Sequence, residues 1–93
     1  MVRVNVRPLG PWQMILGPNS REVDVKGKTL RELIESLDKI SAGVLKKEVL
    51  TETGSLNPRF RIYINGESCD EHGLDTSISD GDSIMLFSVI DGG

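Results

Sequence analysis

The sequence has only one cysteine, Cys69, among its 93 residues. A single cysteine closes no internal disulfide, and it suits a reducing compartment. No apolar run approaches the roughly 20 residues that a membrane-spanning helix needs. The first residues, MVRVNV, alternate between apolar and polar side chains and lack the continuous apolar core of a signal peptide. We therefore expect a cytoplasmic protein with no membrane partner.

Runs of basic residues are also missing. The chain has 11 Lys and Arg against 14 Asp and Glu, for a formal net charge of -3. Since a phosphate backbone is bound by clustered positive charge, nucleic acid is not expected as a partner. A chain of this length buries roughly 60–65% of its unfolded surface around a single core, so residues 1–93 are expected to form one domain.

Two alternating segments open the chain. Residues 2–6 (VRVNV) and 21–25 (REVDV) place valines on one face and polar side chains on the other, as half-buried strands do. The segment between them is rich in proline and glycine, which predicts a loop or a wide hairpin connection. An N-terminal hairpin follows from the two strands.

Residues 29–40 carry the clearest helix pattern. Thr29 and Glu32 are spaced as a capping box, in which each side chain satisfies a free amide of the first turn. One apolar stripe follows at helical spacing, formed by Leu30, Leu33, Ile34, Leu37 and Ile40. Residues 44–50 predict one or two further helical turns after Gly43.

The second half of the chain predicts strands at residues 60–64 and 83–90, with a short strand at 67–70 after the tight turn Asn65-Gly66. The first and last strands are the most apolar, so they are expected at the centre of a mixed sheet with the main helix packed on one face. This order is typical of an α+β fold of the β-grasp, ubiquitin-like kind.

The last strand is apolar on both faces, because Met85 and Phe87 alternate with the equally apolar Ile84 and Leu86, and Val89 continues the series of Met85 and Phe87. One main helix covers one face of a sheet, so these side chains are expected to form an exposed contact surface. The alternative is that the loop around Trp12, or residues 44–50, folds over them. We expect Trp12 to pack against the sheet edge, and a binding role for it is the less favoured interpretation.

The sequence ends in two glycines, Gly92 and Gly93. Glycine is costly to order, so a diglycine end is a poor structural terminus. A segment without side chains can instead enter a narrow slot and present its carboxylate to a reactive group. A partner enzyme using ATP and magnesium could convert this carboxylate to an acyl adenylate, which accepts sulfur or an amine. The alternative is a frayed tail without function.

Three other motifs favour structural interpretations. Residues 26–29 (KGKT) lack the first glycine of a phosphate-binding loop, because Glu22 stands in its place. Cys69 has neither a second cysteine nor an oriented base near it in the sequence. The acidic segment 67–75, with the only histidine, His72, fits no calcium or zinc spacing. We expect no metal site and no enzymatic catalytic residue.

The chain resembles the ubiquitin-like sulfur-carrier family through IYINGE (62–67), ISDGDSIMLF (78–87) and the terminal Gly92 and Gly93. That family includes the small subunit of molybdopterin synthase and the carriers of the thiamine and cysteine pathways. The resemblance implies a protein substrate and shuttle with no cofactor of its own. A ubiquitin-activating-enzyme-like adenylyltransferase would adenylate Gly93, a sulfur donor would convert it to a thiocarboxylate, and a biosynthetic enzyme would accept the sulfur.

The same resemblance implies that partners bind through Met85, Phe87, Val89, Ile90 and Asp91, ahead of the reactive Gly93. Asp91 departs from the small residue that many family tails carry before the glycines, so its charge can favour or oppose a given partner. We expect residues 88–93 to form a flexible tail.

The pathway that receives the sulfur stays open at this point. The segment NPRFRIYIN (57–65) is similar to cysteine-pathway carriers and to archaeal molybdopterin-type carriers, with thiamine synthesis and tRNA thiolation as further options. Two other functions are open as well. The chain could be a modifier joined to lysines through Gly93, leaving Gly-Gly remnants on its targets, or a plain interaction module with an inert tail.

Overall fold

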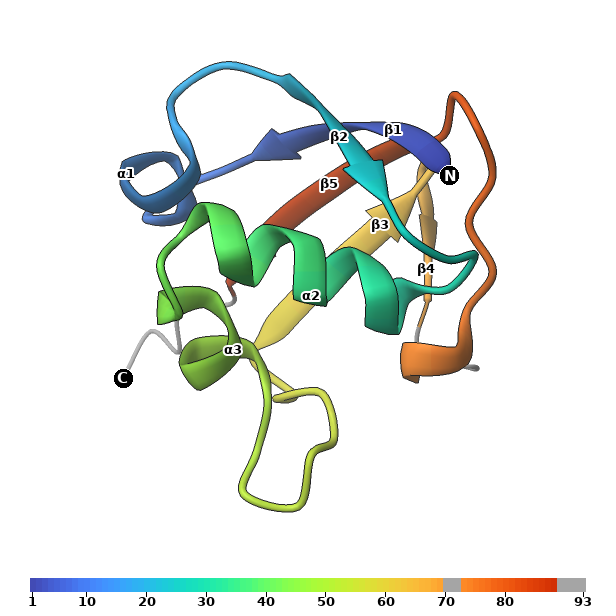
Figure 1. Ribbon diagram of the computed structural model, residues 1–93. Coiled ribbons are helices and arrows are strands. Elements are labelled where there is room, and N and C mark those ends of the chain that lie inside the picture. The colour runs from blue at the N-terminus through green and yellow to red at the C-terminus, as the bar shows by residue number, and fades with distance from the viewer. Residues whose placement is uncertain (70–72, 89–93) are drawn as a thin grey trace.

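The computed structural model describes residues 1–69 and 73–88. Its elements form a five-stranded mixed sheet in the order β2-β1-β5-β3-β4, with α2 and α3 on one face (Figure 1). In chain order they are β1 (Val2–Pro8), α1 (Trp12–Leu16), β2 (Arg21–Val25), α2 (Leu30–Ile40), α3 (Val44–Val49), β3 (Phe60–Ile64), β4 (Glu67–Ser68), the 3-10 turn η1 (Gly73–Asp75) and β5 (Ser83–Ser88). The predicted β-grasp layout is confirmed.

The first and last strands pair in parallel at the centre of the sheet, as the sequence predicts. Val6 lies opposite Ile84 in this ladder, and the backbone amide of Leu9 continues it by donating to the carbonyl of Leu86 over 2.9 Å. β2 and β3 flank this pair in antiparallel orientation. The last described residue, Ser88, therefore ends a strand that is held on both sides.

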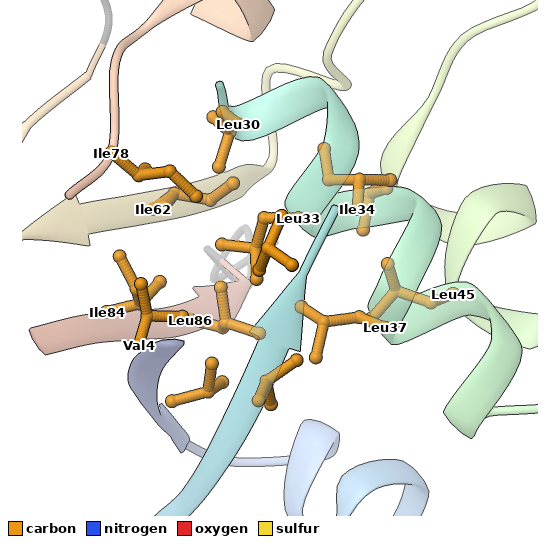
Figure 2. Packing of buried hydrophobic residues seen from close by; sticks show 14 of the residues in the cluster. Val4, Leu30, Leu33, Ile34, Leu37, Leu45, Ile62, Ile78, Ile84 and Leu86 are labelled. Atoms are coloured by element: carbon orange, nitrogen blue, oxygen red, sulfur yellow. The ribbon is translucent and has the colours of Figure 1, made fainter. Parts of the chain in front are cut away.

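The core lies between the sheet and α2. Figure 2 shows Leu33 and Leu37 of α2 facing the same interior as Ile84 and Leu86 of β5, and all four are at most 1% exposed. The predicted stripe is buried up to Leu37, whereas Ile40 at its end is 40% exposed. α3 adds Leu45 and Val49 to the same core.

The start of α2 only partly matches the predicted capping box. The Thr29 hydroxyl donates to the Glu32 carboxylate over 2.6 Å and makes no bond to a backbone amide of the helix. This hydrogen bond from Thr29 is the largest cause that lowers the pKa of Glu32 below its ordinary value, and the backbone amides of Lys28 and Thr29 add smaller contributions in the same direction. The cap works through the glutamate, and the threonine holds that glutamate in place.

The prediction of a plain loop between the first two strands is wrong for residues 12–16, which form α1. Pro11 has φ −59°, already helical, and Gly17 with φ 99° ends the helix. Trp12 and Leu16, four residues apart, are both buried. A helix of one turn and a half has little stability of its own, so burial of these two side chains holds it.

The structure shortens one predicted strand, and it describes only residues 83–88 of the strand predicted at 83–90. β4 ends at Ser68, so Cys69 follows it, and β5 is described only as far as Ser88. The longest helix of the described residues, α2, has 11 residues, and none of the described helices is long and apolar enough to cross a membrane.

Candidate functional site

Met85 and Phe87 lie on the face of the sheet that points away from α2. The side chains of a strand alternate between its two faces, and Ile84 and Leu86 are buried in the core. Met85 and Phe87 therefore point outward, where both are half-buried and neither belongs to the core cluster.

The alternative in which another segment covers Met85 and Phe87 is wrong for the two segments considered. Trp12 is 4% exposed and packs edge-on against Phe60, with ring centroids 5.2 Å apart. Leu45 and Val49 of α3 belong to the same core cluster as Trp12. Both segments lie with the core, so neither folds over the outer face.

Tyr63 joins these two residues on the outer face. It lies opposite Met85 in the antiparallel β3–β5 ladder, and its ring contacts that of Phe87 at a centroid distance of 5.5 Å. We call Tyr63, Met85 and Phe87 the outer patch. The sequence predicted two of its three members and missed Tyr63, whose position on the polar side of the strand at 60–64 was the available signal.

Cationic residues flank the outer patch. Arg7 of β1 is the ladder partner of Met85, and Arg61 of β3 is the partner of Phe87. A concavity of about 280 Å³ lies between Arg7, Tyr63 and Met85. An apolar patch with arginines on two sides is suited to a protein surface that presents apolar side chains within an acidic rim.

A different charge arrangement lies further along the same face, toward β2. The Arg3 guanidinium donates to Asp24 over 2.9 Å and lies 3.6 Å from Glu22. The hydrogen bond and charge of Arg3 lower the pKa of Asp24, and the same pair raises the pKa of Arg3. With two carboxylates around one guanidinium, this region is net acidic, in contrast to the surroundings of the outer patch.

The remaining predicted site residues, Val89, Ile90, Asp91, Gly92 and Gly93, lie outside the described residues. Their roles stay predictions. Ser88, the first residue of the predicted tail, is the last residue of β5. Five residues follow it, and an extended chain of that length reaches about 17 Å.

The two other candidate sites have structural roles in the described part of the chain. Residues 26–29 lead into α2, where the Thr29 hydroxyl donates to the Glu32 carboxylate. Cys69 is buried in the core cluster. No group of three metal-ligating side chains occurs among residues 1–69 and 73–88, and His72 falls in the gap between these ranges.

Sequence reasoning also missed one contact beside the tail. The Trp12 indole N–H donates to the Ser88 hydroxyl over 2.8 Å, across 76 residues of sequence. Ser88 continues the core-facing series of Ile84 and Leu86, so a polar side chain stands where the strand pattern calls for an apolar one. That break in the pattern was the only signal for the contact.

Comparisons with solved structures show the same fold. SAMP1 from Haloferax volcanii matches with a TM-score of 0.79 and 23% identity, over 98% of this chain and 99% of that one. A chain of the BexX/CysO complex from Amycolatopsis orientalis has a TM-score of 0.78 and 26% identity, over 97% and 99%. A putative molybdopterin converting factor, subunit 1, from Pyrococcus furiosus has a TM-score of 0.72 and 23% identity, over 97% and 100%.

A search among curated proteins gave no match. The model of the ThiS family matches residues 10–93, which include the outer patch, β5 and the terminal glycines. The chain thus belongs to the ThiS family, a family of small ubiquitin-like sulfur-carrier and modifier proteins.

Proposed function

We propose that this chain carries sulfur as a thiocarboxylate on Gly93 and donates it to a biosynthetic enzyme. It acts in the cytoplasm as a protein substrate and shuttle, or as the small non-catalytic subunit of a synthase, and catalyses no reaction itself. Its partners are a ubiquitin-activating-enzyme-like adenylyltransferase, a sulfur donor and the sulfur-accepting enzyme. The single observation that carries the proposal is the half-buried outer patch, which lies on the sheet face away from α2 and on the strand that precedes the diglycine end.

The outer patch supplies the docking part of this function. Met85 and Phe87 lie on β5, and Phe87 is six residues before Gly93 in the sequence. An activating enzyme that contacts Phe87 therefore holds the chain within the reach of an extended tail, about 20 Å from Phe87 to Gly93. Arg7 and Arg61 favour a partner with carboxylates around its own apolar contact surface.

Gly93 supplies the chemical part. One carboxylate oxygen of Gly93 attacks the α-phosphorus of ATP, and pyrophosphate leaves as the acyl adenylate forms. A persulfide sulfur then attacks the acyl carbon, which breaks the bond to AMP and leaves an acyl disulfide. A thiol reduces this disulfide to the thiocarboxylate and is itself oxidised. ATP and magnesium act in the activating enzyme, and the tail contributes only its carboxylate and its small cross-section.

The acceptor in this proposal is an enzyme of molybdopterin or tungstopterin synthesis or of cysteine synthesis. The support is the resemblance of residues 57–65 to those carriers, together with 26% identity to a chain of the BexX/CysO complex. A neighbouring gene for a large molybdopterin-synthase subunit, or for a cysteine-synthase-like enzyme, would decide between the two.

Intact mass of the chain isolated from its own host tests the proposal. Because Cys69 is the only cysteine, a Cys69→Ser background removes every thiol except one placed at the C-terminus. We expect a species heavier than the acid by the mass difference between sulfur and oxygen, and this species should react with a thiol-specific alkylating reagent. Deleting Gly92 and Gly93 should remove both signals. A chain found only as the acid, while the activating enzyme and sulfur donor are present and active, contradicts the proposal.

A second candidate function is conjugation to lysines through Gly93, which uses the same acyl adenylate with an amine as the acceptor. The structural likeness to SAMP1, whose family contains modifiers as well as carriers, favours testing it. The last lysine or arginine is Arg61, so trypsin would leave residues 62–93 as a branch instead of a Gly-Gly remnant.

Cleavage beside Asp91 gives a usable remnant for this second function. A protease that cuts after aspartate leaves Gly-Gly on the target lysine, and one that cuts before aspartate leaves Asp-Gly-Gly. We expect both remnants at the same lysines if the chain is a modifier. Their absence from host lysates, beside a detected thiocarboxylate, leaves the carrier function alone.

A further inference from the structure

We propose that the Trp12–Ser88 hydrogen bond anchors the root of the tail, so that Trp12 and Ser88 are positioning residues for activation of Gly93. The inference rests on the proposed function and deepens it. The sequence predicts packing against the sheet edge for Trp12 and a place in the tail for Ser88, but no contact between them, and neither side chain belongs to the outer patch.

The path of the chain brings α1 to the end of β5. The Leu9 amide donates to the Leu86 carbonyl, which carries the β1–β5 ladder to the residue just before the turn. The Trp12 amide then donates to the Leu9 carbonyl over 3.3 Å and begins α1 at that point. The Trp12 indole therefore lies beside Ser88, the last described residue of β5, and donates a hydrogen bond to its hydroxyl.

Ser88 is held from two directions. Its backbone is the ladder partner of Phe60 in β3, and its hydroxyl accepts from the Trp12 indole. The indole itself is fixed, because it is 4% exposed and packs edge-on against Phe60 at an interplanar angle of 74°. Trp12, Phe60 and Ser88 therefore form one contact group at the end of the sheet.

Packing alone does not require this arrangement. An apolar residue at position 88 would continue the core-facing series of Ile84 and Leu86 and would bury more apolar surface. Serine instead accepts a hydrogen bond from a buried donor that needs a partner. The bond fixes the last strand residue before the five that lead to Gly93.

Anchoring here matters because of the length of the tail. With Ser88 fixed, the carboxylate of Gly93 reaches about 17 Å; each strand residue released adds about 3.4 Å. A longer free segment lowers the effective concentration of the carboxylate at the reacting phosphate once the outer patch is docked. Phe87 and Ser88 are adjacent but have different roles: Phe87 contacts the partner, and Ser88 fixes the end of β5 to the rest of the fold.

The test separates docking from chemistry. ATP–pyrophosphate exchange by the host's activating enzyme is measured with wild type, Trp12→Phe, Ser88→Ala and the double variant. Trp12→Phe keeps an aromatic ring and removes only the indole donor. We expect kcat to fall roughly two- to tenfold in each single variant, the value of one neutral hydrogen bond, with KM within about twofold of wild type. The kcat of the double variant should be no lower than that of the less active single variant.

Two further measurements exclude a merely structural effect. Ser88→Thr keeps the hydroxyl and should retain wild-type kcat, and amide hydrogen exchange at position 88 should rise in Trp12→Phe and Ser88→Ala without any partner present. The inference is overturned if kcat and the amide hydrogen exchange at position 88 are both unchanged in Trp12→Phe and Ser88→Ala. It is also overturned if the losses of kcat in the two single variants add up in the double variant. If wild type supports no exchange of pyrophosphate, the proposed function fails, while the hydrogen-exchange result still decides for or against the anchor.

Discussion

At the scale of single residues, the division of β5 into two faces has opposite consequences for neighbouring positions. Leu86 is fully buried against α2, whereas Phe87 is half-buried and contacts Tyr63 on the outer face. The same substitution at these two positions should therefore affect different properties of the protein.

Phe87→Asp is expected to weaken binding to the activating enzyme and leave the domain folded. It removes one aromatic pair, worth about 1 kcal/mol, and places a carboxylate where an acidic partner rim is expected. Leu86→Asp is the matched control and should unfold the chain, because an unpaired charge in the core costs several kcal/mol of a total stability of about 5–15 kcal/mol. Thermal unfolding and a binding assay measure both. A large loss of melting temperature in Phe87→Asp would instead place that residue in the core.

Glu32 gives a prediction about pH. Its hydrogen bond from Thr29, followed by those from backbone amides, stabilises the ionised carboxylate and lowers its pKa below the ordinary 4.5. A lowered pKa in the folded state contributes stability that is present above 4.5 and is lost as the pH falls through the folded-state value.

We therefore expect Glu32→Gln to melt below wild type at neutral pH, with the difference shrinking as the pH falls below 4.5. Glu52→Gln, at an exposed loop position, is the control and should follow wild type at every pH. A Glu32→Gln difference that stays constant across the titration would show that charge on Glu32 has no part in the cap.

At the scale of elements, β2 is the exposed edge of the described sheet next to β1. The Arg3 amide donates to Asp80 and its carbonyl accepts from Gly81, so the backbone of Arg3 faces β5. By strand alternation, the backbone groups of Glu22 and Asp24 face the open edge. Two copies joined antiparallel at this edge would bring these carboxylates together, which disfavours self-association.

Replacing Glu22 and Asp24 together by valine should remove this protection. We expect a sedimentation coefficient that rises with protein concentration for the double variant, because an apolar edge strand pairs readily with another copy. Glu48→Val with Glu52→Val changes the net charge equally at exposed positions away from the edge and should sediment as wild type. Identical sedimentation of both double variants would show that Glu22 and Asp24 do not prevent self-association at the β2 edge.

The elements also show which structure could be predicted from sequence. Local periodicity of apolar residues predicts β1, β2 and α2. The apolar composition of β1 and β5 predicts their pairing at the centre of the sheet. α1 could not be predicted, because its stability comes from burial of Trp12 and Leu16 among residues distant in the sequence. The cap of α2 was predicted by its residue types, whereas its hydrogen-bond pattern depends on the side-chain conformation of Glu32.

At the scale of the whole molecule, the sheet separates a core that holds the fold together from an outer face available to partners. Met85 and Phe87 could be predicted on that face because a strand that is apolar on both sides exceeds what one helix can cover. Tyr63 joins them only through the β3–β5 register, and the Trp12–Ser88 contact joins residues 76 positions apart. Sequence reasoning thus predicted the outward positions of Met85 and Phe87, and the structure added Tyr63 and the Trp12–Ser88 contact; the role of Gly93 stays a prediction.

The central claim is that other proteins act on the carboxylate of Gly93, and ATP–pyrophosphate exchange tests it most directly. The comparison is between wild type and a chain with one alanine added after Gly93, with the same alanine added before Met1 as the control. The account predicts exchange with wild type and with the N-terminal addition, and a loss of at least a hundredfold with the C-terminal one, about 3 kcal/mol of transition-state stabilisation. Equal exchange with all three chains would contradict it.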